Sequence, residues 1–96
     1  MMTLRDVEKT IRKHKPVLRS KFKVKKIGIF GSYVRGDAGK MSDIDILVEL
    51  AEPLGLEFVD LKEYLEKILG LNVDLVTLKA LKPRLRDSIL KEAKYT

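Results

Sequence analysis

Apolar positions near the start of the chain recur at helical spacing and predict a helix capped by Thr3. This stripe consists of Leu4, Val7, Ile11, Leu18 and Phe22. Pro16 interrupts it, so we expect either a kink or the start of a new short segment there. A second helical stripe spans about Leu56 to Leu69. It should end at Gly70, because glycine favours the left-handed backbone that commonly closes a helix.

Three other stretches have the composition of strands. Val24–Phe30 is rich in β-branched and aromatic residues, and the run after Asp43 and the run Val73–Thr77 are similar. A last helix should begin at Pro83. Its apolar side would consist of Leu85, Ile89, Leu90 and Ala93. The predicted order is helix, strand, short helical turn, strand, helix, strand, helix, which indicates an α/β (α+β) domain with a small mixed sheet and packed helices.

Length and composition agree with one globular domain over residues 1–96, since 45% of the residues are hydrophobic and 35% are charged. No apolar run approaches the ~20 residues that a membrane span needs. The first residues lack the pattern of a secretory signal, and the absence of cysteine excludes disulfides and thiolate metal sites. We therefore expect a cytoplasmic protein.

The net charge of +6 is spread unevenly along the chain. Residues 1–30 hold ten Lys and Arg against two acids, residues 31–78 hold four against ten, and residues 79–96 hold six against two. Basic flanks could attract nucleotide phosphates, an RNA or an acidic protein. Solvated helix faces explain the same pattern more simply. The six aromatic residues do not interleave with the basic runs as a platform for stacking single-stranded bases would require. This favours solvated helix faces, with nucleic-acid binding as the open alternative.

A sharp turn follows the first predicted strand. Gly31 and Ser32 stand where the chain leaves that strand, and a helical turn through Tyr33 and Val34 should follow. A glycine lets a ligand approach the backbone closely. Exposed N–H groups at the start of a helical turn, together with the Ser32 hydroxyl, make a site suited to phosphate. An ordinary strand-to-helix turn would use the same residue types.

Two carboxylates stand one residue apart at the start of the second strand. Because strand side chains alternate between faces, Asp43 and Asp45 should point one way and Ile44 the other. Two carboxylates that face a phosphate-binding turn make a hard oxygen site of the kind that holds Mg²⁺. Asp43 alone could be a turn residue. Asp45 is harder to explain in that way, because aspartate disfavours a strand unless something uses it.

A third carboxylate, Asp74, lies at the centre of the apolar run Asn72–Val76. A lone aspartate in such a run is costly to bury unless it is paired or binds a cation. An exposed position on a sheet edge is the alternative. If this strand lies beside the one that carries Asp45, Asp74 completes a cluster of three carboxylates.

At these residues the chain resembles the nucleotidyltransferases of the DNA polymerase β superfamily. Their signature is Gly-Ser, a spacer, Asp-x-Asp and a third acidic residue on a later strand. The stretches GSYVRG, SDIDILVEL and NVDLVT are most similar to the minimal nucleotidyltransferase (MNT) branch, and the resemblance covers nearly the whole chain. It implies a polymerase β-like nucleotidyltransferase fold in which the first two strands run antiparallel and the third lies alongside.

The resemblance also implies roles for the motif residues. Asp43 and Asp45 would hold Mg²⁺, and Asp74 would either bind a second Mg²⁺ ion or act as a general base. The Gly31 backbone and the Ser32 hydroxyl would hold the β and γ phosphates of ATP. Catalysis would then consist almost entirely of positioning and charge stabilisation.

Four further residues keep two interpretations each. Arg35, in the Arg-Gly pair of the MNT-like pattern, could contact nucleotide phosphate or brace the loop Gly36 to Met41. Ser42 should orient the turn at Asp43 rather than react. His14 is the only histidine and is more simply a packed residue than a catalytic one. Tyr95 is more simply a packed or frayed tyrosine than a functional one.

A domain of this length has no second lobe to enclose an acceptor, so we expect a partner or a second subunit. The MNT resemblance implies a HEPN-domain toxin as that partner, with this chain as its antitoxin, adding AMP from ATP to a tyrosine of the toxin. Two alternatives stay open. The chain could neutralise a toxin by binding alone, or it could be a small-molecule or RNA nucleotidyltransferase that works with another subunit.

Overall fold

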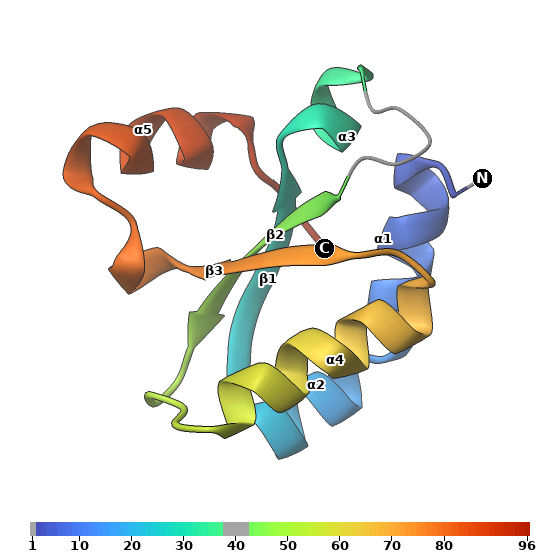
Figure 1. Cartoon of the computed structure of the whole chain (residues 1–96), viewed down its shortest axis with the longest axis vertical. Coiled ribbons are helices and arrows are strands. Elements are labelled where there is room, and N and C mark those ends of the chain that lie inside the picture. The colour runs from blue at the N-terminus through green and yellow to red at the C-terminus, as the bar shows by residue number, and fades with distance from the viewer. Residues whose placement is uncertain (1, 38–42) are drawn as a thin grey trace.

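The structure is a computed structural model, and it describes residues 2–37 and 43–96 (Figure 1). Ser42 and most of the expected loop after Gly36 lie outside these residues. The helices are α1 (Leu4–Lys13), α2 (Lys15–Phe22), α3 (Ser32–Arg35), α4 (Glu57–Leu69) and α5 (Pro83–Glu92), with one 3-10 turn, η1 (Leu78–Ala80). The strands are β1 (Val24–Phe30), β2 (Ile44–Leu50), β3 (Val73–Thr77) and β4 (Lys94–Tyr95).

The strands form one mixed sheet in the order β3-β2-β1-β4. β1 runs antiparallel to β2 and β4, while β3 runs parallel to β2. The predicted mixed sheet with flanking helices is therefore confirmed, including the pairing that the family resemblance implied. The fourth strand was not predicted, because two residues carry no strand pattern and β4 exists only by pairing with the edge of β1.

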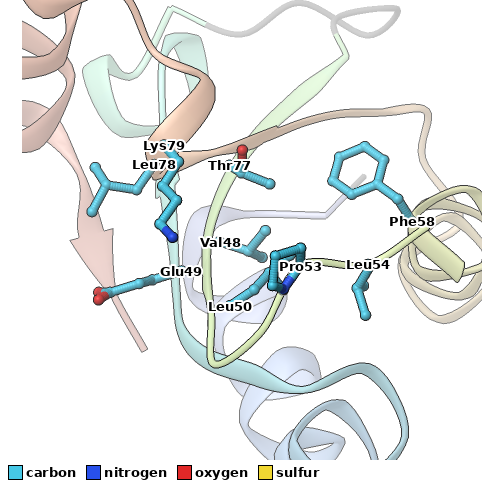
Figure 2. Close-up of a pocket in the computed structure, with 9 residues that line it drawn as sticks. All are labelled: Val48, Glu49, Leu50, Pro53, Leu54, Phe58, Thr77, Leu78 and Lys79. Atoms are coloured by element: carbon cyan, nitrogen blue, oxygen red, sulfur yellow. The ribbon is translucent and has the colours of Figure 1, made fainter.

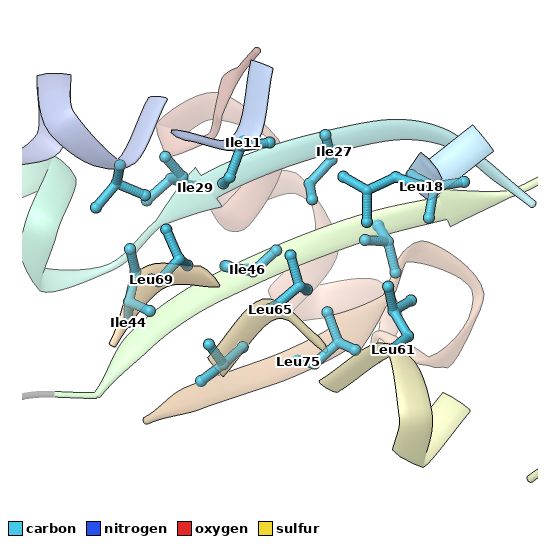
Figure 3. Close-up of a cluster of buried hydrophobic side chains, with 14 of the residues drawn as sticks. Ile11, Leu18, Ile27, Ile29, Ile44, Ile46, Leu61, Leu65, Leu69 and Leu75 are labelled. Atoms are coloured by element: carbon cyan, nitrogen blue, oxygen red, sulfur yellow. The ribbon is translucent and has the colours of Figure 1, made fainter. Parts of the chain in front are cut away.

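Helices α1, α2 and α4 cover one face of the sheet, and α5 lies on the opposite side (Figure 1). The hydrophobic core fills the space between the sheet and the three helices, as Figure 3 shows. Ile29 of β1, Ile46 of β2 and Leu65 of α4 are fully buried there. Burial of one such side chain contributes about 1.5–3 kcal/mol. This core holds the two central strands in place, and those strands carry the candidate site.

The predicted first helix is divided into α1 and α2 at His14, just before Pro16. Thr3 caps α1 as expected, since its hydroxyl accepts a hydrogen bond from the Asp6 N–H and the Asp6 carboxylate accepts one from the Thr3 N–H. His14 Nδ1 lies 2.9 Å from the Thr10 carbonyl oxygen, and the His14 ring meets the Tyr64 ring edge-on. These contacts make His14 a packed residue of the helical layer.

The apolar side expected for the last helix exists, but it does not join the core. Within the described part of the chain, no residue of α5 is buried, and Leu85 and Leu90 are 49% and 36% exposed. After η1 the chain continues on the side of the sheet opposite α4, so α5 lies away from the core formed by α1, α2, α4 and the sheet (Figure 1). No helix among the described residues has the length and apolar character that crossing a bilayer requires.

Candidate active site

The strand register brings the predicted site residues together from distant parts of the sequence. β2 starts beside the end of β1, so Asp45 pairs with Phe30, the residue that precedes the Gly31–Ser32 turn. β3 runs parallel to β2, and Asp74 pairs directly with Asp45. Paired residues on neighbouring strands share a face, so one row of the sheet carries Phe30, Asp45 and Asp74.

The alternation of β2 separates the carboxylates from the core. Ile44 and Ile46 are fully buried against the helices, while Asp45 between them is only partly buried. Asp43 lies one residue before β2 and is exposed. The prediction that Asp43 and Asp45 share the face opposite Ile44 therefore agrees with the burial of these residues.

Negative charge is concentrated around Asp45. Burial of its carboxyl, together with the charge and hydrogen bond of Asp74 and a smaller contribution from Asp43, raises the pKa of Asp45 to about 6. The positive charge of Arg35 opposes this effect. Carboxylates held together against their mutual repulsion are suited to a divalent cation that prefers oxygen ligands.

The carboxylates alone supply only part of the ligands that such a cation needs. In residues 2–37 and 43–96, no three His, Cys, Asp or Glu side chains converge closely enough to hold a metal ion as they stand. Asp45 and Asp74 face each other, and Asp43 stands beside them. Mg²⁺ typically takes one or two carboxylates and completes its shell with water and substrate phosphate oxygens. The donor set present here is therefore compatible with Mg²⁺ in the presence of a nucleotide.

Gly31 packs directly against Asp45. Its backbone has φ +78° and ψ −149°, a conformation essentially restricted to glycine. A Cβ atom on Gly31 would overlap the Asp45 carboxylate, with the Asp45 Cγ only 2.9 Å away. The spacing of the Gly-Ser and Asp-x-Asp motifs thus has a steric meaning, since the turn and the carboxylate occupy adjoining space.

Ser32 begins the short helix α3, whose Tyr33 is buried and anchors the turn to the core. The carbonyl oxygens of Gly31 and Ser32 accept the hydrogen bonds that close α3. No acceptor among the described residues bonds the N–H groups of Ser32 and Tyr33. Two donors therefore point out of the turn beside the partly buried Ser32 hydroxyl.

Arg35 is exposed and bonds two protein carboxylates. Its Nη1 donates to Glu92 Oε1 at 3.0 Å, and its Nε donates to Asp37 Oδ2 at 3.4 Å. The hydrogen bond to Glu92 and the charge of Asp37 hold the pKa of Arg35 above its usual value. Arg35 thus braces the turn in this structure, and contact with nucleotide phosphate stays a prediction.

Glu92 is a site residue that sequence reasoning missed. It lies at the end of α5, and its Oε2 accepts a hydrogen bond from the Gly31 N–H at 3.1 Å. The only signal in the sequence is that it is one of two acids in the basic segment 79–96. Nothing in its spacing predicts a contact with a turn 61 positions away.

A separate apolar pocket of about 330 Å³ lies at the opposite end of β2 from Asp45 (Figure 2). Its lining includes Leu50, Leu54, Phe58 and Leu78. The pocket contains Glu49 and Lys79 but no cluster of carboxylates. Its apolar lining would make it a candidate for a ligand site, yet the chemistry points to the Asp45 row, because a divalent cation such as Mg²⁺ needs oxygen ligands.

Comparison with known proteins identifies the family. A family model described as the nucleotidyltransferase domain matches residues 11–96. The chain belongs to the nucleotidyltransferase domain family. The protein adenylyltransferase MntA of Thermococcus cleftensis is 49% identical over 96 residues, which cover 99% of this chain and 97% of the relative. The predicted resemblance is confirmed, and the chain is a nucleotidyltransferase.

Solved structures of toxin-antitoxin proteins share the fold. A crystal structure described as a toxin-antitoxin with AMP-PNP matches with a TM-score of 0.75 and 33% identity, and the match covers 92% of this chain and 70% of that one. A structure of a tri-AMPylated Shewanella oneidensis HEPN toxin in complex with MNT antitoxin matches with a TM-score of 0.67 and 28% identity, over 93% of this chain and 70% of that one.

The raised pKa of Asp45 predicts how the stability of the metal-free nucleotidyltransferase depends on pH. The folded protein binds a proton on Asp45 up to about pH 6, whereas the unfolded chain releases it near 3.8. The free energy of unfolding should therefore fall as the pH rises from about 4 to 6, and stay lower above that range. Because Asp45 is only partly buried, we expect a change of about 1 kcal/mol or less.

Asp45→Asn should remove this dependence, so that without metal the variant is more stable than the wild type at pH 7.5 but not at pH 4. Thermal unfolding in the presence of a chelator measures the difference. Asp60→Asn, an exposed position on α4, is the matched control and should leave the pH dependence unchanged. Equal stability of the Asp45 variant and the wild type at both pH values would contradict the prediction.

Proposed function

We propose that this nucleotidyltransferase is a protein adenylyltransferase that acts as an antitoxin, transferring AMP from ATP to a tyrosine hydroxyl of a HEPN-domain toxin. The observation that carries the proposal is the row formed by Asp45 and Asp74 next to the Gly31–Ser32 turn. The 49% identity to a named protein adenylyltransferase supports the reaction class. The toxin-antitoxin complexes of similar fold support the partner.

Each residue of the motif has a part in this reaction. Gly31 and Ser32 would hold the β and γ phosphates through the N–H groups and hydroxyl of the turn. Two Mg²⁺ ions held by Asp43, Asp45 and Asp74 would supply neutralisation of the charge that develops on the phosphates. Asp74, whose side chain is exposed on β3, could instead accept a proton as general base.

The bond changes in the proposed transfer balance without a further reactant. The tyrosine oxygen attacks the α phosphorus of ATP, and the bond from that phosphorus to the bridging oxygen breaks. Pyrophosphate leaves, and the phenolic proton passes to a carboxylate such as Asp74 or to water. The chain's contribution is to align the two reactants and to stabilise charge, as is usual for phosphoryl transfer.

Intact-protein mass spectrometry tests the proposal directly. This protein is incubated with ATP, Mg²⁺ and the HEPN-domain product of a neighbouring gene, and the mass of the partner is recorded. We expect additions in steps of one AMP, with tandem spectra that locate the AMP on tyrosine. An unchanged mass together with a stable, inactive complex would instead establish an antitoxin that acts by binding. A neighbour that binds RNA or a small substrate would favour the third alternative.

A further inference from the structure

The side chain of Glu92 binds two donors at the Gly31–Ser32 turn, the Gly31 N–H and the Arg35 guanidinium. One carboxylate oxygen accepts the Gly31 N–H at 3.1 Å, and the other accepts Arg35 Nη1 at 3.0 Å. The side chain is only 25% exposed, so both oxygens are held against the turn rather than in solvent. An anion from the last residue of α5 thus binds a backbone N–H and a guanidinium, which are the groups that commonly bind phosphate oxygens.

A bound triphosphate would compete with this carboxylate. Phosphate oxygens bound to the N–H groups of Ser32 and Tyr33 would lie next to the Glu92 carboxylate, and two anions at contact distance repel each other strongly where water is partly excluded. The row of Asp45 and Asp74 adds further negative charge next to Gly31. Nucleotide and Glu92 are therefore expected to exclude each other from the turn.

The helix that carries Glu92 is weakly held, so displacement is physically accessible. None of the described residues of α5 is buried, and α5 contributes no side chain to the hydrophobic core. Beyond α5, the two-residue strand β4 and the Thr96 N–H join the chain to the edge of β1. Segments with few buried apolar contacts open locally at low free energy. The bonds from Glu92 to Gly31 and Arg35 tie the end of α5 to the turn across 61 and 57 positions of sequence.

We propose that Glu92 is an autoinhibitory latch, which holds the nucleotide-binding turn closed and is displaced, with the end of α5, when a nucleoside triphosphate binds. The inference rests on the proposed function, because it takes the Gly31–Ser32 turn as the phosphate site. Affinity for nucleotide is then lowered by the fraction of molecules in which the latch is closed. Anything that draws α5 away from the turn would raise that affinity.

A competing role for Glu92 predicts the opposite sign. If the carboxylate positions Arg35 for contact with the triphosphate, its removal should weaken nucleotide binding. Calorimetric titration with AMP-PNP and Mg²⁺ in the absence of the toxin separates the two roles, because without an acceptor hydroxyl no AMP is transferred and the titration reports binding alone. For Glu92→Gln, which keeps the shape of the side chain and removes its charge, the latch predicts a Kd about fivefold lower than that of the wild type.

Asp87→Asn is the matched control, since it makes the same charge change at an exposed position on the same helix. Asp87 lies outside the contacts that join Glu92 to Gly31 and Arg35, so its variant should bind as the wild type does. Hydrogen exchange gives a second readout. In the wild type, AMP-PNP and Mg²⁺ should speed exchange in residues 92–96, and in Glu92→Gln these residues should exchange fast without nucleotide.

Each outcome is decisive. Weaker or unchanged binding by Glu92→Gln would overturn the latch while leaving the proposed function intact, provided the wild type binds nucleotide. If neither the wild type nor the variant binds AMP-PNP, the turn is not a phosphate site. Both the latch and the proposed function are then wrong. Thermal unfolding shows whether the variant is folded, and Glu92→Asp, with a shorter reach, should give an intermediate Kd.

Discussion

Replacing Asp43 or Asp45 by asparagine is expected to lower the rate of nucleotide transfer by on the order of 10³-fold or more. Asparagine keeps the size of the side chain but removes the negative charge that binds a divalent cation. Asp45 is the stronger case, because it lies in register with Asp74 and against Gly31. The measurement is the initial rate of AMP incorporation into the HEPN-domain partner, with ATP and Mg²⁺ at saturating concentrations.

Asp60→Asn on α4 is the control for a general change of charge and should transfer AMP at the wild-type rate. The same variants separate catalysis from binding, since loss of transfer should abolish neutralisation of the toxin if the modification is what inactivates it. Toxin that is still neutralised by Asp43→Asn and Asp45→Asn would show that complex formation suffices. If both variants transferred AMP at a rate close to that of the wild type, the metal-binding role of Asp43 and Asp45 would be refuted.

Gly31→Ala is expected to combine a large loss of activity with a measurable loss of stability. The backbone of Gly31 lies in a region that other residues adopt at a cost of order 1–3 kcal/mol. Its new methyl group would also displace the carboxylate of Asp45, since Asp45 Cβ and Cγ lie 3.3 and 2.9 Å from the place that this group would occupy. A displacement of about 1 Å at a catalytic group can lower the rate by roughly a hundredfold.

Gly70→Ala separates backbone strain from this steric conflict. Gly70 also has a positive φ, +66°, but nothing lies within 4 Å of the position of its Cβ atom. We expect Gly70→Ala to lose about 1 kcal/mol of stability and no activity. Chemical denaturation and the initial transfer rate, measured for both variants, test the pair. Equal effects of the two substitutions on activity would mean that the contact between Gly31 and Asp45 is not needed for catalysis.

The three longer strands, and the face of the sheet on which the carboxylates lie, could be predicted from the sequence because they depend on local periodicity. Two-residue alternation places Asp43 and Asp45 opposite Ile44 whatever the rest of the chain does. The end of α4 is local too, since Gly70 adopts the left-handed conformation after the last turn. The spacing between the Gly-Ser and Asp-x-Asp motifs was informative for the same reason, because each motif belongs to a local element.

Contacts between distant segments were decided only by the tertiary structure. The pairing of Asp45 with Asp74 depends on the register of β2 and β3, and a shift of one residue would turn Asp74 to the other face. The short strand β4 forms only because the edge of β1 is free to pair. Neither the register of two strands nor the exposure of a sheet edge produces a periodic pattern in the sequence.

The C-terminal helix shows the difference most clearly. Its apolar stripe, with Leu85 and Leu90, is a local pattern and was predicted, yet burial depends on what the rest of the fold places opposite it, and these side chains stay exposed. The contact of Glu92 with Gly31 and Arg35 joins residues 61 and 57 positions apart. Periodicity governs which residues share a face, whereas the path of the chain through η1 governs which faces meet, and only the folded structure specifies that path.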